Sequence, residues 1–223
     1  MRAQDKPSCA PKALSENHSK TSMSAVPPEK RDMFISKALS YLLRHGADKE
    51  KLPLDEHGWA KVSDVLANNR IRTHRATQED IRRIVAQNAK QRFTLSERSD
   101  GDYICANQGH SLERVCPELE LLTLETMPRE VYHGTYENKL DTIMQHGLNR
   151  MARNHIHLAC NEPWSRLGSR ASSTVFIYID IDKCLSAGIS FYRSKNGVIL
   201  TSGNAQGCIP LEYFARVERR SKS

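Results

Sequence analysis

Arginines and histidines gather in residues 150–159, which have the sequence RMARNHIHLA. If this segment is a strand, His155 and His157 point to the same face, because side chains alternate between the two faces of a sheet. Two imidazoles on one face are able to hold a metal ion. The two arginines just upstream disfavour a metal, because cations repel a cation. The segment therefore poses a choice between a metal site and an anion site.

Arginines and histidines also stand at the ends of other predicted segments. Arg44 and His45 end an apolar run, Arg92 precedes Phe93, and His133 lies in a predicted strand-to-helix turn. Each one alone is explained without a ligand, for example by a charge that complements a helix end. Together they have no matching set of carboxylates, so they make a poor divalent-metal site. Guanidinium groups stay charged and bind oxyanions bidentately, so the set favours a phosphate.

The composition suits a basic, soluble chain. Its 223 residues are enough for one large domain or two small ones. Lys and Arg outnumber Asp and Glu by 33 to 26, which gives a formal net charge of +7. Such an excess indicates an acidic partner, with nucleic acid as the first choice. An ordinary soluble basic protein explains the charge equally well.

Several sequence signals are missing, and they limit the classes of protein to consider. No run approaches the ~18 apolar residues of a membrane span, and we see no secretory signal, so we expect no membrane partner. The six cysteines form no CxxC pair, so we expect reduced thiols and a location in the cytoplasm, the nucleus or both. Neither GxGxxG nor GxxxxGKS/T is present, so a bound nucleotide is not held by a Rossmann or P-loop turn.

The first half of the chain is predicted to hold a disordered tail and a helical lobe. Residues 1–31 are rich in Lys, Ser, Pro and Ala, with almost no large apolar residue. Three helices follow, the first from Asp32 as its cap to Gly46, the second with Ser63 as its cap, and the third opened by a capping box at residues 77–80. Residues 92–95 and 102–105 are predicted to form a hairpin. Three helices followed by a hairpin are typical of a winged helix.

The second half is predicted to be rich in strands. Residues 119–128 are a candidate linker, and residues 174–180 are expected to form a buried central strand. Asp180 and Asp182 are interpreted as strand-end or helix-capping residues. The other predicted elements are strands at residues 130–133, 155–158, 191–192, 198–201 and 207–209 and helices at residues 140–146 and 182–187.

Seven segments together resemble the RNA 2'-phosphotransferase (Tpt1/KptA) family. They follow one another in the family's order and span about residues 33–217. The segments are SYLLRHG at 40–46, DEHGW at 55–59, KQRF at 90–93, ANQGHS at 106–111, VYHGT at 131–135, RMARNHIH at 150–157 and FYRSKNGVILT at 191–201.

The resemblance implies an α+β protein with two lobes. Residues 32–122 are expected to form an N-terminal winged-helix lobe that binds RNA. Residues 123–218 are expected to form a C-terminal ADP-ribosyltransferase-like lobe that binds NAD, followed by a short tail at residues 219–223. The implied partners are NAD as co-substrate and RNA with an internal 2'-phosphate, such as spliced tRNA. We expect no metal and a monomer.

The resemblance also implies the reaction. The family removes the 2'-phosphate that tRNA splicing leaves at the junction, and it transfers this phosphate to NAD. The RNA 2'-phosphate attacks the nicotinamide ribose, nicotinamide leaves, and an ADP-ribosylated RNA forms. A ribose hydroxyl then attacks the phosphorus, which gives 2'-hydroxyl RNA and ADP-ribose 1'',2''-cyclic phosphate.

The family's functional residues map by motif onto three sets in this sequence. The catalytic set is expected at Arg44, His45, Arg92 and Arg153, with Arg150 as a competitor for the last position. The set that contacts NAD is expected at His133, Gly134, Thr135, Asn154 and His155. The set that contacts RNA is expected at Arg70, Arg72, Arg75, His110 and Ser111. One departure is Cys105, which stands where the family pattern leads us to expect a basic residue.

Three other functions stay open from the sequence. A related enzyme that stops at ADP-ribosylation, and so caps a terminal phosphate of RNA or DNA, needs the same phosphate clamp. A winged-helix nucleic-acid binder with a decayed C-terminal lobe is disfavoured, because all four positions of the catalytic set are intact. A His-x-His metallohydrolase is disfavoured by the missing carboxylates, and it predicts loss of activity with a chelator.

Overall fold

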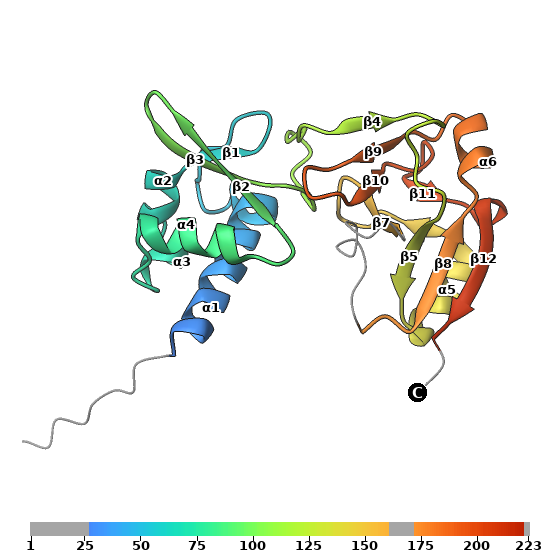
Figure 1. The fold of residues 1–223 in the computed structure, drawn as a ribbon, viewed down its shortest axis with the longest axis horizontal. Helices are drawn as coiled ribbons and strands as arrows, with labels where there is room; N and C mark the ends of the chain where they lie inside the picture. The colour runs from blue at the N-terminus through green and yellow to red at the C-terminus, as the bar shows by residue number, and fades with distance from the viewer. Residues whose placement is uncertain (1–26, 161–171, 221–223) are drawn as a thin grey trace, which may run out of the picture.

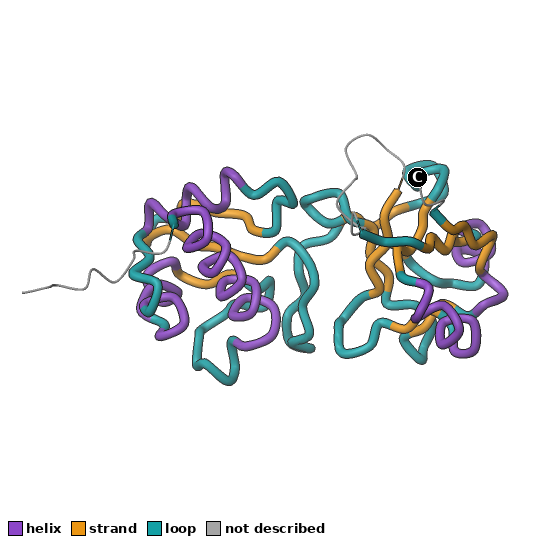
Figure 2. The backbone as a smooth tube through the Cα atoms, turned by 90° about the horizontal axis from the view of Figure 1, so that it is seen from below, coloured by secondary structure: helices purple, strands orange, loops and turns teal. Residues whose placement is uncertain are grey.

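Two hydrophobic cores divide the protein into two lobes that lie side by side (Figures 1 and 2). The structure is a computed structural model that describes residues 27–160 and 172–220. One core is built from residues between Ile35 and Val115, and the other from residues between Leu122 and Val217. We call residues 27–116 the N-lobe and residues 117–220 the C-lobe. The predicted mixture of helix and sheet is confirmed.

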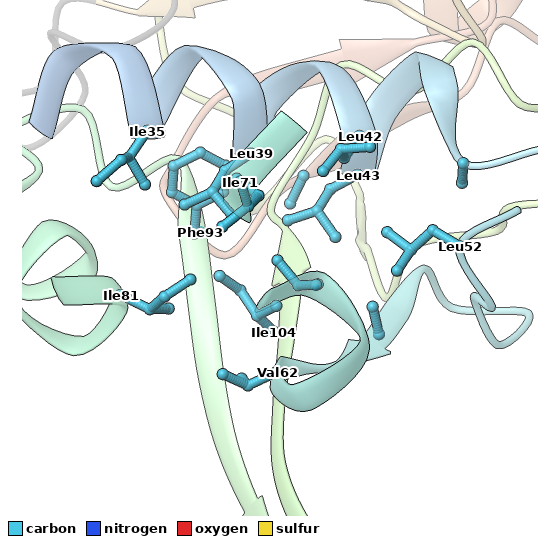
Figure 3. Close-up of a cluster of buried hydrophobic side chains, with 14 of the residues drawn as sticks. Ile35, Leu39, Leu42, Leu43, Leu52, Val62, Ile71, Ile81, Phe93 and Ile104 are labelled. Atoms are coloured by element: carbon cyan, nitrogen blue, oxygen red, sulfur yellow. The ribbon is translucent and has the colours of Figure 1, made fainter. Parts of the chain in front are cut away.

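The N-lobe packs its helices against a three-stranded antiparallel sheet with the order β1-β3-β2. Figure 3 shows the core between them, where Leu39 and Leu43 meet Phe93 and Ile104. The elements are α1 (Pro28–Tyr41), η1 (Leu42–Gly46), β1 (Trp59–Lys61), α2 (Val62–Ala67), α3 (Asn69–Arg72), α4 (Gln78–Gln87), β2 (Phe93–Arg98) and β3 (Gly101–Ala106).

The predicted helices and hairpin of the N-lobe are present, but two predicted caps are wrong. The first helix begins at Pro28, not at Asp32, because Pro is favoured in the first helical turn. The second begins at Val62, so Ser63 lies inside it. The capping box of the third helix is confirmed, with Thr77 and Asp80 bonded reciprocally. Strand β1 and helix α3 were not predicted, since both are too short for a periodic pattern.

The C-lobe is built on a seven-stranded sheet with the order β12-β8-β5-β7-β10-β9-β4, in which each neighbouring pair is antiparallel. A small second sheet joins β11 to β6. The strands are β4 (Glu120–Leu122), β5 (Val131–Thr135), β6 (Leu148–Asn149), β7 (Ile156–Cys160), β8 (Val175–Ile179), β9 (Phe191–Arg193), β10 (Ile199–Thr201), β11 (Cys208–Ile209) and β12 (Phe214–Arg219). The helices are α5 (Glu137–His146), α6 (Ile181–Ser186) and η2 (Leu211–Tyr213).

Two predicted boundaries in the second half of the chain are wrong. The candidate linker at residues 119–128 contains β4, which pairs with β9 and so belongs to the C-lobe sheet. The last strand, β12, was not predicted and runs to Arg219, past the expected domain end at residue 218. Strand β8 is buried as expected, although only β12 separates it from the sheet edge. The expected capping by Asp180 is confirmed by its bond to the Lys183 backbone N–H.

Part of the predicted tails lies outside the described residues, namely residues 1–26 and 221–223. Residues 28–31, which we assigned to the tail, belong to α1. Within residues 27–160 and 172–220, no helix has the length and apolar character needed to cross a membrane.

Candidate active site

Arg44 and His45 lie on η1, a π-helical turn that ends the first helix. The turn is anchored by Leu42 and Leu43, which are fully buried in the N-lobe core. Gly46 closes it, and a Cβ on this residue would collide with the ring of Tyr41. Glycine is therefore the residue that lets the wide turn pack, and the turn fixes where Arg44 and His45 point. Single π turns inside helices recur at functional sites.

Arg44 carries a partly buried guanidinium group, and no carboxylate pairs with it among the described residues. Its Nε and Nη2 atoms are shielded from solvent and have no hydrogen-bond partner in the part of the chain that the structure describes. Burial, and then the neighbouring charges of Arg92 and Arg153, lower the pKa of Arg44 to about 10. The guanidinium stays charged at neutral pH. Its two shielded donors and the surrounding positive charge are therefore suited to bind an anion.

His45 lies beside the same cluster and bonds to Ser111. Its Nδ1 atom is 2.9 Å from the Ser111 hydroxyl, and the Ser111 backbone N–H donates to the Arg44 carbonyl at 2.9 Å. Burial, and then the charges of Arg153 and Arg44, lower the pKa of His45. The imidazole is therefore kept neutral at physiological pH, in a state that accepts a proton.

Arg92 reaches the cluster from the turn between α4 and β2. Its Nη1 atom donates to the Asn88 side-chain oxygen at 3.2 Å, and its carbonyl accepts from the Asn107 N–H at 2.9 Å. Arg92 also lines a cavity of about 490 Å³ between α1 and α4, together with Lys37 and Ser40. The described cavity is large enough for a nucleotide, and it opens beside one arginine of the cluster.

Arg153 and Arg150 face different surroundings. Arg153 is exposed and contributes to the lowered pKa of both Arg44 and His45. Arg150 donates to the Arg153 carbonyl at 2.9 Å, and burial, followed by the charge of Arg150, lowers the pKa of His155. Arg150 lines a second cavity of about 560 Å³ with Asn154, His155 and Tyr192, among others. Of the two arginines, Arg153 is the one whose charge acts on both Arg44 and His45.

The two histidines of the opening segment have separate roles in the structure. His155 precedes β7 and lines the cavity with Arg150, whereas His157 lies within β7 and bonds through Nε2 to the Gln108 side-chain oxygen at 2.8 Å. Burial, and then Arg153, lower the pKa of His157 to about 3. Among the described residues, no three His, Cys, Asp or Glu side chains come together as a metal-ligand group.

The predicted strand at residues 130–133 is confirmed and carries His133, but Gly134 and Thr135, expected in the turn that follows, belong to the same strand, β5. The three residues pair with Ile177, Phe176 and Val175 of β8, and helix α5 starts only after Tyr136. Pairing with β8 extends the strand to Thr135, two residues beyond the predicted strand end at His133. The His133 Nδ1 atom is 3.0 Å from the His157 carbonyl, so the expected NAD-contacting strand lies next to β7.

Comparison with known proteins identifies the family. The profile of the RNA 2'-phosphotransferase, Tpt1 / KptA family matches residues 30–203. The chain belongs to this family. Relatives named tRNA 2'-phosphotransferase 1 in Danio rerio and Bos taurus are 41% and 44% identical to it, covering 86% and 82% of this chain and 87% and 74% of the relatives. The tRNA 2'-phosphotransferase of Saccharomyces cerevisiae is 40% identical, covering 85% of this chain and 84% of the relative.

The predicted family and the predicted class of enzyme, a 2'-phosphotransferase, are therefore confirmed. The family motif at residues 106–111 has a place in the structure that the sequence did not reveal. Asn107 contacts the Arg92 backbone, Gln108 contacts His157, and Ser111 contacts His45. Asn107 and Gln108 were not among the predicted site residues. The signal was a polar run without apolar residues after a strand, which is equally typical of a loop.

The residues expected to contact RNA divide into exposed and enclosed ones. Arg72 and Arg75 are exposed on the N-lobe. Arg70 is exposed too, but it bonds to Glu50 at 2.6 Å and lies 4.3 Å over the ring of Tyr41. His110 is only 2% exposed, and burial followed by the charge of Arg44 lowers its pKa to about 4. In this conformation His110 lies inside the protein, not on a surface open to RNA.

Asn154 and Cys105 are also more enclosed than the family pattern suggested. The Asn154 side-chain amide donates to the Leu112 and Val115 carbonyls at 3.0 and 3.3 Å, so it ties the C-lobe to the N-lobe. Cys105 lies on β3 with 5% of its surface exposed, and burial raises the pKa of its thiol to about 12. The thiol is therefore a neutral, packed group and not a substitute for the expected basic residue.

Proposed function

We propose that the protein is an NAD-dependent RNA 2'-phosphotransferase that removes the splice-junction 2'-phosphate of tRNA through an ADP-ribosylated RNA intermediate. The observation that carries the proposal is the guanidinium of Arg44, which is partly buried, lies near the charges of Arg92 and Arg153, and has two shielded donors unused among the described residues. A buried cation without a carboxylate is costly unless a bound anion completes it. The names of the relatives, tRNA 2'-phosphotransferases, support an RNA 2'-phosphate as that anion.

We propose distinct tasks for the two lobes. Helices packed on a hairpin-containing sheet support a winged-helix N-lobe, with RNA phosphates bound nonspecifically by Arg72 and Arg75. The seven-stranded C-lobe is proposed to be ADP-ribosyltransferase-like. The cavity of about 560 Å³ beside Asn154 and His155 has a volume that suits part of a dinucleotide, and Arg150 on its wall suits a diphosphate. These features fit NAD as a co-substrate, with His133 and Gly134 of β5 on its nicotinamide side.

The residues of the site have separate roles in the proposed reaction. In the first step the RNA 2'-phosphate, held by Arg44, Arg92 and Arg153, attacks the nicotinamide ribose and nicotinamide leaves. In the second step the phosphorus is attacked by the neighbouring ribose hydroxyl, and the RNA 2'-oxygen leaves. The arginines stabilise the negative charge that builds on the phosphate in this step. His45, kept neutral, is placed to take the proton of the attacking hydroxyl, and its imidazolium form then protonates the leaving oxygen.

The test is a reaction with defined products. The protein is incubated with NAD, EDTA and a short RNA that carries one internal 2'-phosphate, and the products are analysed by mass spectrometry. We expect 2'-hydroxyl RNA, nicotinamide and ADP-ribose cyclic phosphate. An RNA that keeps its 2'-phosphate would contradict the proposal. Loss of activity with EDTA alone would instead support a metal-dependent hydrolase.

A strand with a terminal phosphate separates the proposal from its main alternative. The exposed side chain of Arg153 leaves the arginine cluster open to a phosphate at a strand end as well as to an internal one. A terminal phosphate lacks the bond to a 2'-oxygen that the second step breaks. If the protein ADP-ribosylates a 5'-phosphorylated strand and leaves the internal 2'-phosphate in place, capping is its activity.

A further inference from the structure

The turn that presents Arg92 has an unfavourable backbone conformation. Gln91, directly before Arg92, has a φ of 41°, which lies in the left-handed region that residues other than glycine seldom adopt. Inside the turn, the Gln91 N–H donates to the Asn88 carbonyl at 2.7 Å, and the Lys90 N–H donates to the Asn88 side chain at 3.1 Å. These bonds use the N–H groups of the turn and leave the carbonyls of Lys90 and Gln91 to find donors elsewhere.

Asn107 of the N-lobe holds the second of these carbonyls. Its side-chain amide donates to the Gln91 carbonyl at 2.7 Å, and its backbone N–H donates to the Arg92 carbonyl at 2.9 Å. The Thr94 hydroxyl donates to the Asn107 side-chain oxygen at 2.6 Å, which fixes the orientation of the amide. Asn107 is only 6% exposed, so water does not readily replace it.

Asn196 of the C-lobe holds the first carbonyl. It lies between β9 and β10, and its side-chain amide donates to the Lys90 carbonyl at 3.0 Å. The Ser194 hydroxyl donates to the Asn196 side-chain oxygen at 2.8 Å, so the amide is oriented here as well. Asn196 is 4% exposed. Two neighbouring carbonyls before Arg92 are therefore held by one asparagine from each lobe.

We propose that Asn196, together with Asn107, is a positioning residue for Arg92. Through this contact the C-lobe fixes where Arg92 lies in the phosphate clamp, the cluster of Arg44, Arg92 and Arg153. The inference rests on the proposed function, because it assigns to Arg92 a contact with the 2'-phosphate. Without the Asn196 amide, the Lys90 carbonyl loses the donor that holds it, and the turn relaxes from its left-handed conformation. Arg92 then moves away from Arg44 and Arg153, although no residue that contacts the substrate has changed.

The experiment measures how strongly the protein prefers RNA with a 2'-phosphate. The affinities for two matched RNAs, one with an internal 2'-phosphate and one with a 2'-hydroxyl, are measured without NAD, and their ratio reports the clamp alone. We expect Asn196→Ala to reduce this ratio by about tenfold, the size of one charge-assisted hydrogen bond lost to the phosphate. The affinity for 2'-hydroxyl RNA should stay unchanged, which a general loss of structure would not allow.

The matched control is Lys195→Ala on the same hairpin. Lys195 is exposed, pairs with Glu118 at 2.6 Å and lies 5.1 Å over the ring of Trp59, so it joins the lobes without touching the Arg92 turn. We expect this variant to keep the wild-type ratio. An equal loss in both variants would show that lobe docking in general, and not the Asn196 bond, sets the clamp, and would overturn the inference.

A double-mutant cycle with Arg92→Ala decides whether Asn196 acts through Arg92. If it does, Asn196→Ala changes the ratio in the wild type and leaves it unchanged in the Arg92→Ala background. Equal effects in both backgrounds would contradict the inference. If Asn196→Ala does not fold, Asn196→Asp replaces it, because the carboxylate keeps the Ser194 bond and removes the donor to Lys90. A wild-type protein with no preference for the 2'-phosphate would refute the proposed function instead.

Discussion

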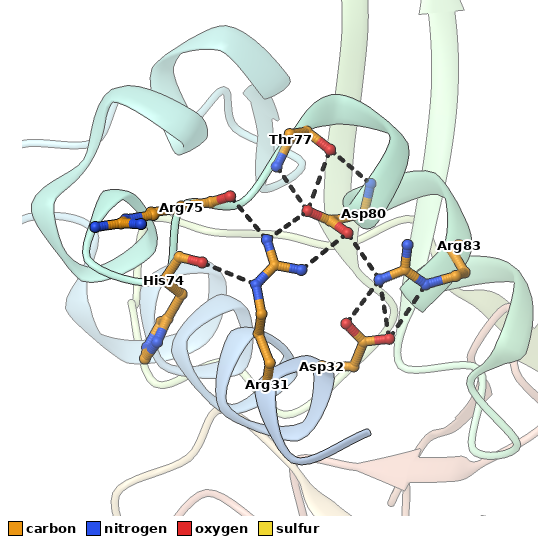
Figure 4. Close-up of polar contacts among 7 residues, drawn as sticks. All are labelled: Arg31, Asp32, His74, Arg75, Thr77, Asp80 and Arg83. Carbon is orange, nitrogen blue, oxygen red and sulfur yellow. Dashed lines mark hydrogen bonds and ion pairs between the residues drawn. The ribbon is translucent and has the colours of Figure 1, made fainter. Parts of the chain in front are cut away.

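The two ends of the first helix carry arginine clusters of opposite design. Near its start, Arg31 bonds to Asp80 at 2.7 Å, and Asp32 bonds to Arg83 at 2.7 Å (Figure 4). At its end, Arg44 has Arg92 and Arg153 as neighbours, with no carboxylate among the groups that shift its pKa. The same residue type is saturated at one end and unsatisfied at the other, within a single helical segment.

The pKa shifts express this difference. The hydrogen bond from Arg31 holds the pKa of Asp80 well below its usual range, and hydrogen bonds to Asp32 and Asp80 raise that of Arg83. Burial and like charges lower the pKa of Arg44. The first cluster therefore favours its charged state and stabilises the fold. In the second cluster the charged state is disfavoured until an anion binds. The free energy gained when an anion relieves this charge repulsion therefore adds to ligand binding.

The strongest test of this comparison is Arg44→Ala. We expect phosphotransfer to fall at least about a thousandfold, because a buried donor that stabilises a phosphoryl transition state is lost. The melting temperature should stay the same or rise, because an uncompensated buried charge is removed. Turnover assays and thermal melts measure the two effects. A variant with a lower melting temperature and normal turnover would reverse the assignment of the two clusters.

The opposite result is expected for Asp80→Ala. This change removes the partner of Arg31 and Arg83 and half of the capping box with Thr77, so we expect a loss of about 2–3 kcal/mol in the free energy of unfolding. The turnover of the folded fraction should remain close to that of the wild type. Urea titration measures the loss. The exposed Glu118 offers a control, since Glu118→Ala should cost at most about 1 kcal/mol.

The two regions should also respond to acid in different pH ranges. His110 and His157 have pKa values lowered to about 4 and about 3, mainly by burial. The unfolded chain binds protons at these residues near pH 6.5 and the folded one does not, so stability falls as the pH drops from about 6.5 towards 4. We expect each of the two histidines to contribute a loss of about 2 kcal/mol between pH 7 and pH 5. Asp80 contributes to the pH dependence only below its unfolded pKa of 3.8, because protonation of its carboxylate there removes stability.

Urea titrations at pH 7 and pH 5 measure this dependence, and His110→Gln identifies its source. The amide does not titrate, so the loss between the two pH values should be smaller in this variant. The Asp80→Ala variant should keep the full dependence, because the Asp80 carboxyl is ionised across this range. A dependence that vanished with Asp80 and persisted without His110 would contradict the separation of the two regions.

The smallest effect expected is the stabilisation by inorganic phosphate. If the second cluster binds an anion, phosphate should raise the melting temperature of the wild type relative to sodium chloride of equal ionic strength. At ten times its dissociation constant the gain is about 1.4 kcal/mol. Asp80→Ala should keep this increase and Arg44→Ala should lose it. An increase of the same size in all three proteins would mean that phosphate acts outside the arginine cluster.

The sequence predicted the fold best for elements that are determined by residues close together in the chain. The Thr77 capping box and the β2–β3 hairpin were visible because each depends on a few neighbouring residues. Strands β1, β4 and β12 were missed because they are short or carry exposed polar residues, and their partners decide their conformation. The start of α1 was missed because Pro28 was assigned to the tail, and the bond from Arg31 to Asp80 in the first turn forms only in the fold, 49 positions away.

The candidate site was likewise predictable where neighbouring residues determine it and not where contacts between distant residues do. The residue types at Arg44, Arg92 and Arg153 pointed to an anion, and the family motifs selected Arg153 over Arg150. The supporting contacts were not predictable, because Asn107, Asn196 and Ser111 act through bonds to residues far along the chain. His110 looked like a polar loop residue, and its burial, with Gly58 close to its ring, became visible only in the folded structure.

The wide turn of Leu42–Gly46 has a consequence for protein engineers who want a heat-resistant version. A procedure that rewards regular helices would replace Gly46 with alanine, for a nominal gain of about 1 kcal/mol in helix propensity. The new methyl group would push against the ring of Tyr41 and straighten the turn that carries Arg44 and His45. Designs ranked by helix propensity alone would thus favour inactive enzymes. Residues 42–46 should be held fixed while the exposed face of α1 is optimised.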